Sequence, residues 1–552
     1  INMTWNAGTT GTSSIANGVP LSFDATRTVG ATGRGALSIA GDAQYFQEDS
    51  YGTNASYRFD NGKWKVDASA SYASSSRART NQENGKFFTG VTAVSINPVR
   101  VTFTEIGGLR PNGIQVFDNN NNPVDAYNIN NYAMSSATDV PQKQVGNSEF
   151  GKLNVGRRLD LFSFPNSIQI GTAYRLRTLD ARRQSITWNF TGANPSPAPY
   201  LFQNFVNQDL FLGFKTPPSI SSERAYGAFV ANPSLFSQTP AQIVSAETFR
   251  IANSQYIKET VGAYYAQWEA RFLKNRLRLL TGIRFEKTKD AAQGPLIDPN
   301  AVFVRNANGT FAHTAAGARI RKPEAGAAGS IEELRLVRHE RTSHTDGSYH
   351  GYYPSLHLTY DIRENFLVRL AYAKTYGRPD LSQIIPTTTI NEADLSSNPN
   401  AIPGSISTTN TGLKPWTADN YDLSLEYYGN QGGSFSAGVF RKDIKDFFGA
   451  VTKIATAEDL AILGLDNEYV GWNLTTTFNS GDARVSGCEF SARQSLNLLG
   501  ALDRHFTVFV NGTLLRLQGN PYASFGSFIP KTANWGISFN WRRLTIAPRW
   551  NY

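Results

Sequence analysis

The fold of this chain is decided by residues 352–376, which read YYPSLHLTYDIRENFLVRLAYAKTY. Apolar and polar residues alternate on both sides of a short turn at 363–365, which is the pattern of two half-buried antiparallel strands. One face carries Tyr352, Leu356, Leu358 and Tyr360 from the first strand and Phe366, Val368, Leu370 and Tyr372 from the second. Each strand has about ten residues, the length of a tilted membrane-crossing strand. Tyrosines end the apolar face, as expected where such a face meets two lipid–water interfaces.

The same pattern recurs along the chain and predicts seven hairpins, or about fourteen strands. The predicted turns lie at 60–62, 164–167, 274–276, 363–365, 430–433, between 496 and 506, and at 542–543. The last strand is expected over 544–552. The predicted fold class is therefore all-β, a transmembrane antiparallel β-barrel.

The connections alternate in length, because each short turn is followed by a long link. The long links cover about 79–147, 179–255, 287–349, 377–417, 445–481 and 518–531. Structureless links of this length argue against a compact soluble domain. Short periplasmic turns and long extracellular loops are instead typical of an outer-membrane barrel. Within the first loop, 99–104 and 113–117 predict a further hairpin, and segments 3–5 and 36–46 near the N-terminus have the pattern of strands.

Composition agrees with a barrel and disfavours several other classes. The chain has 552 residues, of which 40% are hydrophobic and only 18% charged. No run of 18 apolar residues occurs, so no transmembrane helix is predicted. The mean hydropathy of -0.35 is compatible with a barrel, because only alternate residues of each strand face lipid. The net charge of +9 is scattered, which favours anionic ligands or headgroups over nucleic acid.

Several motifs in the second half of the chain resemble those of the TonB-dependent receptors of Gram-negative outer membranes. They are YPSL at 353–356, AYAKTYGRPDL at 371–381, NTGLKPWTADNYDLSLEY at 410–427, FRKDIKDFF at 440–448, GDARVSGCE at 481–489 and IPKTANWG at 529–536. Trp416 stands where the family often has Glu. The resemblance covers roughly 350–552, and only the hairpin pattern supports it upstream.

This resemblance implies a barrel of about 22 strands filled by a plug domain. Neither a plug nor a TonB box is found in 1–552, so we interpret the whole chain as a partial barrel domain that also lacks the final strands. The family implies import of a scarce nutrient, either a ferric siderophore, cobalamin, haem or a glycan. The implied partners are TonB with its inner-membrane complex, acting through the plug, and outer-membrane lipid and lipopolysaccharide. No nucleic-acid partner is implied.

Two other functions remain open for such a barrel. One is a passive porin-like channel, which would have neither plug nor TonB. The other is a non-transport surface or scaffold protein built on a receptor barrel. A soluble hydrolase or lectin is the least favoured reading, and extraction without detergent would support it.

No catalytic constellation or cofactor site is predicted, and the chain is expected not to be an enzyme. Gly-x-Ser-x-Gly, a P-loop lysine motif and Cys-x-x-Cys are all missing from the sequence. Three histidines of the loop 287–349 (His339, His344 and His350) could gather around a metal or haem. His339 and His344 are five residues apart, where a helical zinc motif needs four. We therefore favour solvated loop side chains.

Two sets of side chains are predicted to lie on opposite faces of the wall. Arginines on the lumen face are Arg175, Arg177, Arg278, Arg284, Arg369 and Arg549. They could attract an anionic ligand, but we favour ion pairs with acidic residues of a plug, because charges in a lumen need partners. Aromatic residues predicted to form the lipid-facing girdle are Trp64, Tyr72, Trp268, Tyr352, Tyr360, Tyr372, Tyr421, Tyr427, Trp535 and Trp541.

Overall fold

The structure is a computed structural model of the chain. It describes residues 2–5, 22–23, 27–29, 35–82, 88–107, 110–160, 162–203, 215–307, 310–393, 402–410, 413–429, 432–463, 465, 467–496, 505–519 and 528–552. None of the helices in these ranges has the length and apolar character that a membrane span requires.

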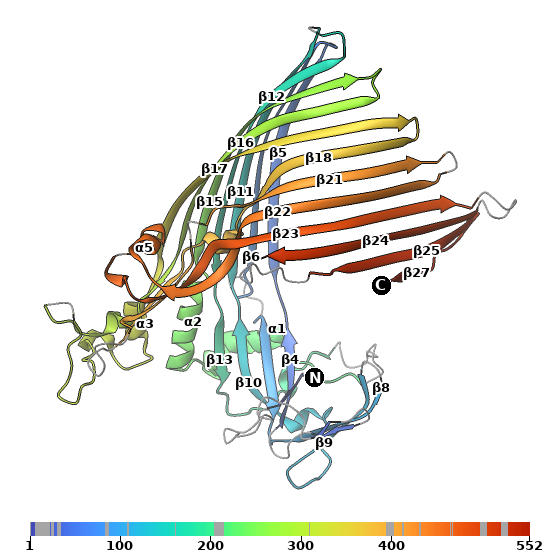
Figure 1. Cartoon of the computed structure of the whole chain (residues 1–552). Helices are drawn as coiled ribbons and strands as arrows, with labels where there is room; N and C mark the ends of the chain where they lie inside the picture. The colour runs from blue at the N-terminus through green and yellow to red at the C-terminus, as the bar shows by residue number, and fades with distance from the viewer. Residues whose placement is uncertain are drawn as a thin grey trace.

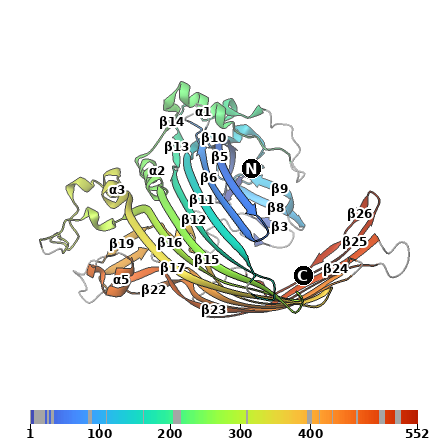
Figure 2. The same cartoon turned by 90° about the horizontal axis from the view of Figure 1, so that it is seen from above.

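A single antiparallel sheet with the strand order of a barrel forms the wall of the molecule. Its long strands are β5 (Phe46–Asp60), β6 (Trp64–Arg79), β11 (Gln142–Leu159), β12 (Asn166–Arg183), β15 (Gln255–Phe272), β16 (Leu277–Ile297), β17 (Arg338–Arg363), β18 (Phe366–Gly377), β21 (Trp416–Tyr428), β22 (Ser434–Ile454), β23 (Asn473–Ser495), β24 (Phe506–Gly519) and β25 (Lys531–Trp541). Two short strands follow, β26 (Leu544–Ile546) and β27 (Arg549–Asn551). Figure 1 shows the wall from the side, and Figure 2 shows that it curves.

The strand pairs of the seven predicted hairpins are all confirmed. The short turns that the structure describes lie together at one end of the wall (Figure 1). The last strand differs from the prediction, because 544–552 is broken into β26 and β27. Both pieces pair with β25, Leu544 opposite Trp541 and Trp550 opposite Trp535. Pro548 lies in the break, and a proline has no N–H to donate to a ladder. β26 and β27 therefore occupy one strand position next to β25, and the proline interrupts the strand between them.

The two faces of the wall differ in chemistry, as the alternating pattern predicts. Register pairs Tyr264 with Phe285 and Phe285 with Tyr352, so one row of aromatic side chains crosses three strands. Tyr264 is 63% exposed and Tyr352 is 58% exposed, although both lie in the middle of long ordered strands. The neighbouring residues in sequence project to the opposite face, which carries Gln267, Glu286 and other polar side chains. The apolar face is therefore the outer one.

A second sheet covers part of the long-loop end. It comprises β1 (Asn2–Trp5), β4 (Gly35–Asp42), β7 (Gly90–Ser95), β10 (Tyr132–Asp139), β13 (Ile186–Phe190) and β14 (Phe236–Ser237), in that order. β4 leads almost directly into β5, and β10 leads into β11, so this sheet continues the wall beyond its rim (Figure 1). Beside it lies a four-stranded sheet of β2 (Ser22–Phe23), β3 (Arg27–Val29), β8 (Arg100–Gly107) and β9 (Arg110–Phe117). The β8–β9 pair is the hairpin expected within the first loop.

The second sheet encloses a hydrophobic core. Phe88 is completely buried and its ring lies 5.3 Å from Trp188 and 5.1 Å from Tyr226. Beneath it, the buried Asp139 accepts hydrogen bonds from Asn81 (3.2 Å) and from the Thr89 hydroxyl (2.8 Å). These contacts join segments from two predicted loops, 79–147 and 179–255. The long connections are thus packed structures and not structureless links.

The remaining elements are short and lie mainly at the long-loop end (Figures 1 and 2). The α-helices are α1 (Ser222–Ala231), α2 (Pro240–Ala252), α3 (Ile331–Val337), α4 (Leu381–Ile384) and α5 (Ala457–Leu463). The 3-10 helices are η1 (Ile129–Asn131), η2 (Ala198–Tyr200), η4 (Pro233–Leu235), η5 (Pro299–Val302), η6 (Pro323–Ala325) and η7 (Asn467–Tyr469). Thr239 and Gln242 form a capping box that starts α2, the helix that packs beside β17.

A small hairpin ties two distant wall strands together. β19 (Thr388–Glu392) pairs with β20 (Gly404–Thr408), and each also forms a short parallel ladder with the wall. β19 joins β16 at Leu296, and β20 joins β23 at Leu474. The hairpin thereby closes a ring around β17, β18, β21 and β22. Ile406 and Leu474 are fully buried there against α5, which anchors the junction.

Candidate functional site

The candidate site is a cluster of charged side chains on the inner face of β12, β15 and β16. Arg175 and Glu259 come from β12 and β15, and their side chains lie 3.2 Å apart. Arg284 and Glu286 are two residues apart on β16 and therefore share the same face, with a contact of 2.6 Å. Glu259 and Glu286 are only 8% and 7% exposed, so each needs a positive partner.

Arg378 completes this cluster from a different part of the chain. Its guanidinium lies 3.0 Å from Glu286 and 3.5 Å from Glu259, and its side chain is 18% exposed. It also donates to the Tyr376 hydroxyl at 2.7 Å, and that hydroxyl donates to Glu286. One arginine therefore bridges two buried carboxylates on adjacent strands, as the guanidinium fork allows.

Arg378 reaches the inner face because β18 leaves its neighbour. β17 and β18 stop pairing at Ser355–Ala373, while β18 stays paired with β21 as far as Gly377. The Tyr376 ring stacks on Tyr353 with centroids 4.4 Å apart. Pro379 then prevents further ladder pairing. The chain therefore turns away from the wall at this point.

The segment that follows, 378–386, packs against the wall, and we call it the inward segment. Ile384 and Ile385 are buried against Ile257 and Ala292, which lie opposite each other on β15 and β16. At Gly294 the approach is so close that a Cβ would lie 2.0 Å from the carbonyl oxygen of Pro386. Glycine is thus required there by space.

A hollow of about 370 Å³ lies beside this cluster and is lined in part by Arg175, Arg284, Glu286, Tyr376 and Arg378. A third buried carboxylate, Asp290 of β16, lies directly opposite Glu259 of β15 in the strand register. The arginines Arg175, Arg284 and Arg378 therefore face an equal number of carboxylates, from Glu259, Glu286 and Asp290. The inner face here is polar but nearly neutral. It offers hydrogen-bonding groups to a polar solute without a strong preference for one sign of charge.

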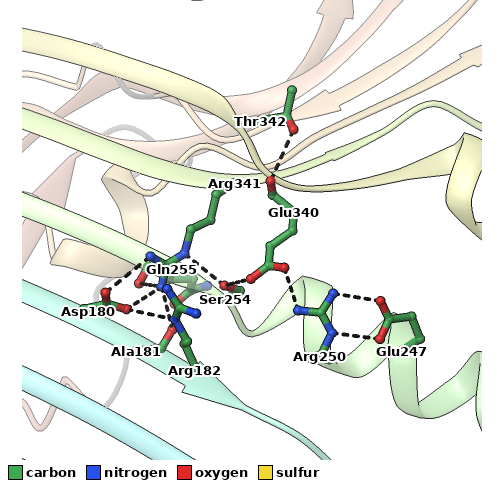
Figure 3. Close-up of polar contacts among 10 residues, drawn as sticks. All are labelled: Asp180, Ala181, Arg182, Glu247, Arg250, Ser254, Gln255, Glu340, Arg341 and Thr342. Atoms are coloured by element: carbon green, nitrogen blue, oxygen red, sulfur yellow. Dashed lines mark hydrogen bonds and ion pairs between the residues drawn. The ribbon is translucent and has the colours of Figure 1, made fainter.

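A second polar network, at the rim on the long-loop side, fixes α2 and the start of β17 (Figure 3). Arg250 of α2 contacts Glu247 at 2.7 Å and Glu340 of β17 at 2.5 Å. Glu340 also accepts from the Ser254 hydroxyl at 2.5 Å. Arg341 forms an ion pair with Asp180 of β12, and its Nε donates to the Ser254 hydroxyl at 2.9 Å. The network links three wall strands to one helix.

These contacts shift the ionisation of the carboxylates at the rim. Hydrogen bonds from Arg250 lower the pKa of Glu247. Burial would raise the pKa of Glu340, but hydrogen bonds from Ser254 and Arg250 outweigh it and lower the pKa below its ordinary value. Hydrogen bonding from Arg341 lowers the pKa of Asp180. All three groups are therefore stabilised as anions, which favours the ion pairs at neutral pH.

Comparison with known proteins identifies the family of this barrel. The family model described as "TonB dependent receptor-like, beta-barrel" matches residues 3–552. The chain belongs to this family. No curated protein matches the chain.

Solved receptor structures align with this chain at low identity and low TM-score. The siderophore receptor PirA from Pseudomonas aeruginosa is 13% identical, with 97% of this chain and 71% of that chain covered and a TM-score of 0.37. The ferric citrate transporter FecA in its unliganded form is 10% identical, with coverages of 95% and 61% and a TM-score of 0.42. BauA, the ferric preacinetobactin receptor from Acinetobacter baumannii, is 9% identical, with coverages of 95% and 67% and a TM-score of 0.37. The chain thus spans between 61% and 71% of these three chains.

The arginines predicted on the lumen face of this TonB-dependent receptor barrel find partners within the wall. Arg278 contacts Glu269 at 3.0 Å, and Arg369 contacts Glu426 at 2.9 Å. Arg175 and Arg284 are paired as described above. For these four a neighbouring strand or the same strand supplies a carboxylate, and pairing with acidic residues of a plug stays a prediction. Arg549 instead lies 6.0 Å from the Phe509 ring centroid, on the exposed β27.

The three histidines are placed along β17 and not in a loop. His339, His344 and His350 pair with Leu296, Gln293 and Lys287 of β16. At about 3.3 Å per residue, His344 and His350 are roughly 20 Å apart, too far to share one ion. Over the described residues, no group of three or more His, Cys, Asp or Glu is arranged to hold a metal. The interpretation as solvated side chains is the one that this geometry favours.

The predicted girdle residues lie on the wall strands, and their role at a lipid interface stays a prediction. Those with large exposed side chains are Trp64, Tyr352, Tyr360, Tyr421, Tyr427, Trp535 and Trp541. Tyr72, Trp268 and Tyr372 are partly covered by neighbours. Tyr72 lies 6.1 Å from Tyr51, and Tyr372 lies 5.3 Å from Tyr421 between ring centroids.

Sequence reasoning missed the central members of the cluster. Glu259 and Glu286 lie just beyond the predicted ends of their strands, which the structure extends. Tyr376 and Arg378 belong to the AYAKTYGRPDL motif, but the motif gives no signal of what they contact. Only the non-local packing of the inward segment brings these residues together.

Proposed function

We propose that this chain is the membrane-spanning wall of an outer-membrane importer that is energised through TonB. The observation that carries the proposal is the two-faced wall of seven hairpins, with the described short turns at one end, in a chain whose family match covers 3–552. A lipid-exposed sheet of this kind places short turns in the periplasm and long loops outside the cell. The barrel provides a path and does no chemistry.

The proposed substrate is a scarce nutrient, a ferric siderophore, cobalamin, haem or a glycan. It would bind on the long-loop side and pass along the inner face, with TonB and the inner-membrane complex acting through a plug. The polar, nearly neutral hollow beside Arg378 supports passage of a polar solute, because its groups can replace lost water contacts.

The test is uptake by cells that carry or lack the full gene. Cells are given labelled ferric siderophores, cobalamin, haem and oligosaccharides in turn, and accumulation is measured. The proposal expects a large loss of uptake for one class in the deletion strain, restored by the gene on a plasmid. Equal uptake of every class in both strains would contradict it and favour a surface or scaffold role.

A further inference from the structure

A cavity of about 290 Å³ opens beside the rim network, at the ends of β6, β11 and β12 and next to α2. Its lining includes four cationic side chains, Arg79, Lys143, Arg182 and Arg250, and one carboxylate, Glu340. Strand ends from three wall positions and one helix therefore contribute cationic residues to the lining of one cavity. The inner-face cluster around Arg378 is a separate site, because the two cavities share no lining residue.

The carboxylates nearby do not neutralise this charge. Glu340 and Glu247 are both engaged by Arg250. Asp180 is shared, since it forms an ion pair with Arg341 and lies 3.6 Å from Arg182. Lys143 makes no ion pair with any carboxylate of the described residues. Counting these groups gives an excess of cations around the cavity.

Arg79 adds to the excess of positive charge, and one of its N–H donors has no hydrogen-bond partner. Its Nε is buried without a hydrogen-bond partner, and its guanidinium lies 4.6 Å from the centroid of the Phe46 ring. Its hydrogen bonds are long, 3.5 Å to the Val140 carbonyl and 3.3 Å to Gln44. Gln142 of β11 pairs with Arg79 of β6 on one side and with Arg183 of β12 on the other. The positive charge of Arg183 repels that of Arg79. The Asp139 carboxylate offsets part of this repulsion, but like charges on neighbouring strands destabilise a sheet. A bound anion would relieve this repulsion.

We propose that this cavity is a binding site for a phosphate group. Arginine and lysine side chains around a cavity of this size match a compact, doubly charged anion, and Arg donates in a fork that fits its oxygens. Gln142 and Gln184 add neutral polar groups to the lining. The site is independent of the proposed function, since it lies at the rim and not on the inner path. The phosphate comes either from a lipid headgroup of the surrounding membrane or from free phosphate.

The test uses the full-length protein purified in detergent and the double variant Lys143→Gln, Arg182→Gln. Both side chains are exposed, so the fold is retained. The matched control is Lys287→Gln, Lys289→Gln, which removes the same charge from exposed positions of β16 that do not line the cavity. Binding of inorganic phosphate is measured by calorimetry. The proposal expects saturable binding that weakens about tenfold or more in the double variant and stays within about twofold in the control.

A second arm identifies the source. Protein is mixed with bisphosphorylated lipid A in mixed micelles, and separately with the dephosphorylated lipid. Binding that needs the lipid phosphates and is lost in the double variant assigns the site to the membrane, whereas binding of inorganic phosphate alone assigns it to free phosphate. Failure of the wild-type protein to bind either ligand would overturn the proposal, as would an equal loss in the control variant.

Discussion

The Arg378 guanidinium lies 3.0 Å from the Glu286 carboxylate, although 92 residues separate the two in the chain. This contact fastens the inward segment to the inner face of β16 and neutralises a carboxylate that is only 7% exposed. This one contact therefore connects the end of β18, the polar inner face and the packing of the inward segment 378–386.

Replacing Arg378 by alanine should destabilise the barrel strongly. Glu259 and Glu286 would lose their shared partner and keep only Arg175 and Arg284. The loss should therefore approach but not exceed the cost of breaking a buried ion pair, about 3–5 kcal/mol. The free energy of unfolding is measured by urea denaturation in detergent, followed by tryptophan fluorescence.

The control for that variant is Arg58→Ala. Arg58 also pairs across strands, with Asp67 at 2.8 Å, but its side chain is 78% exposed. An exposed pair of this kind contributes little, because solvent screens it, so a much smaller loss of stability is expected than for Arg378→Ala. Similar losses in the two variants would show that the Arg378 cluster is not a buried, interdependent one.

Gly294→Ala should displace the inward segment. The added methyl would meet the Pro386 carbonyl, and the backbone has to shift, at a cost of about 1–3 kcal/mol. Faster hydrogen exchange is expected at 384–388. Gly151→Ala is the control, because nothing lies within 4 Å of a Cβ at that position. Unchanged exchange in Gly294→Ala would mean that the segment does not rest on β16.

The attachment of α2 to the wall should weaken in acid. The pKa of Glu340 is lowered from its ordinary value of 4.5 in the folded protein. Its ion pair therefore stabilises the fold fully above about pH 4.5, and this stability is lost as the pH falls through the lowered folded value. Hydrogen exchange of α2, corrected for intrinsic pH effects, should rise over that window. Glu340→Gln should show a flatter profile there, and identical profiles would contradict the linkage.

A charge on the outer face should cost more than one on the inner face. Ile170 is 55% exposed on the apolar side of β12, and Gln169 projects to the other side. Ile170→Arg should destabilise the protein in lipid vesicles by about 2–4 kcal/mol, since the midplane excludes charge. Gln169→Arg should cost about 1 kcal/mol, the value of its hydrogen bond to Tyr265. A larger loss of stability in Gln169→Arg than in Ile170→Arg would contradict the assignment of the apolar face to lipid.

The wall could be predicted from the sequence because its information is local. Alternation within 352–376 and similar stretches identifies both faces of each strand, and short turns identify the neighbours. The break between β26 and β27 was missed, although Pro548 was there to signal it.

The packing of the loops could not be predicted, because it depends on contacts between distant segments. β4 of the N-terminal segment, β7 and β10 of one long link and β13 of the next pair in one sheet, and no local period encodes that order. The partners of Arg175, Arg284 and Arg378 were likewise hidden, since Glu259 and Glu286 lie beyond the stretches with clear alternation. The charge of these arginines predicts that each has an anionic partner, but only the three-dimensional structure shows which carboxylate it is.

The most direct test of the central claim is the initial rate of substrate uptake with and without TonB. Cells expressing the full gene, with tonB present or deleted, are given the substrate class found in the deletion experiment. The account predicts saturable uptake that falls to the background of the gene-deletion strain when TonB is removed. Uptake that continues unchanged without TonB would contradict the account and identify a passive channel.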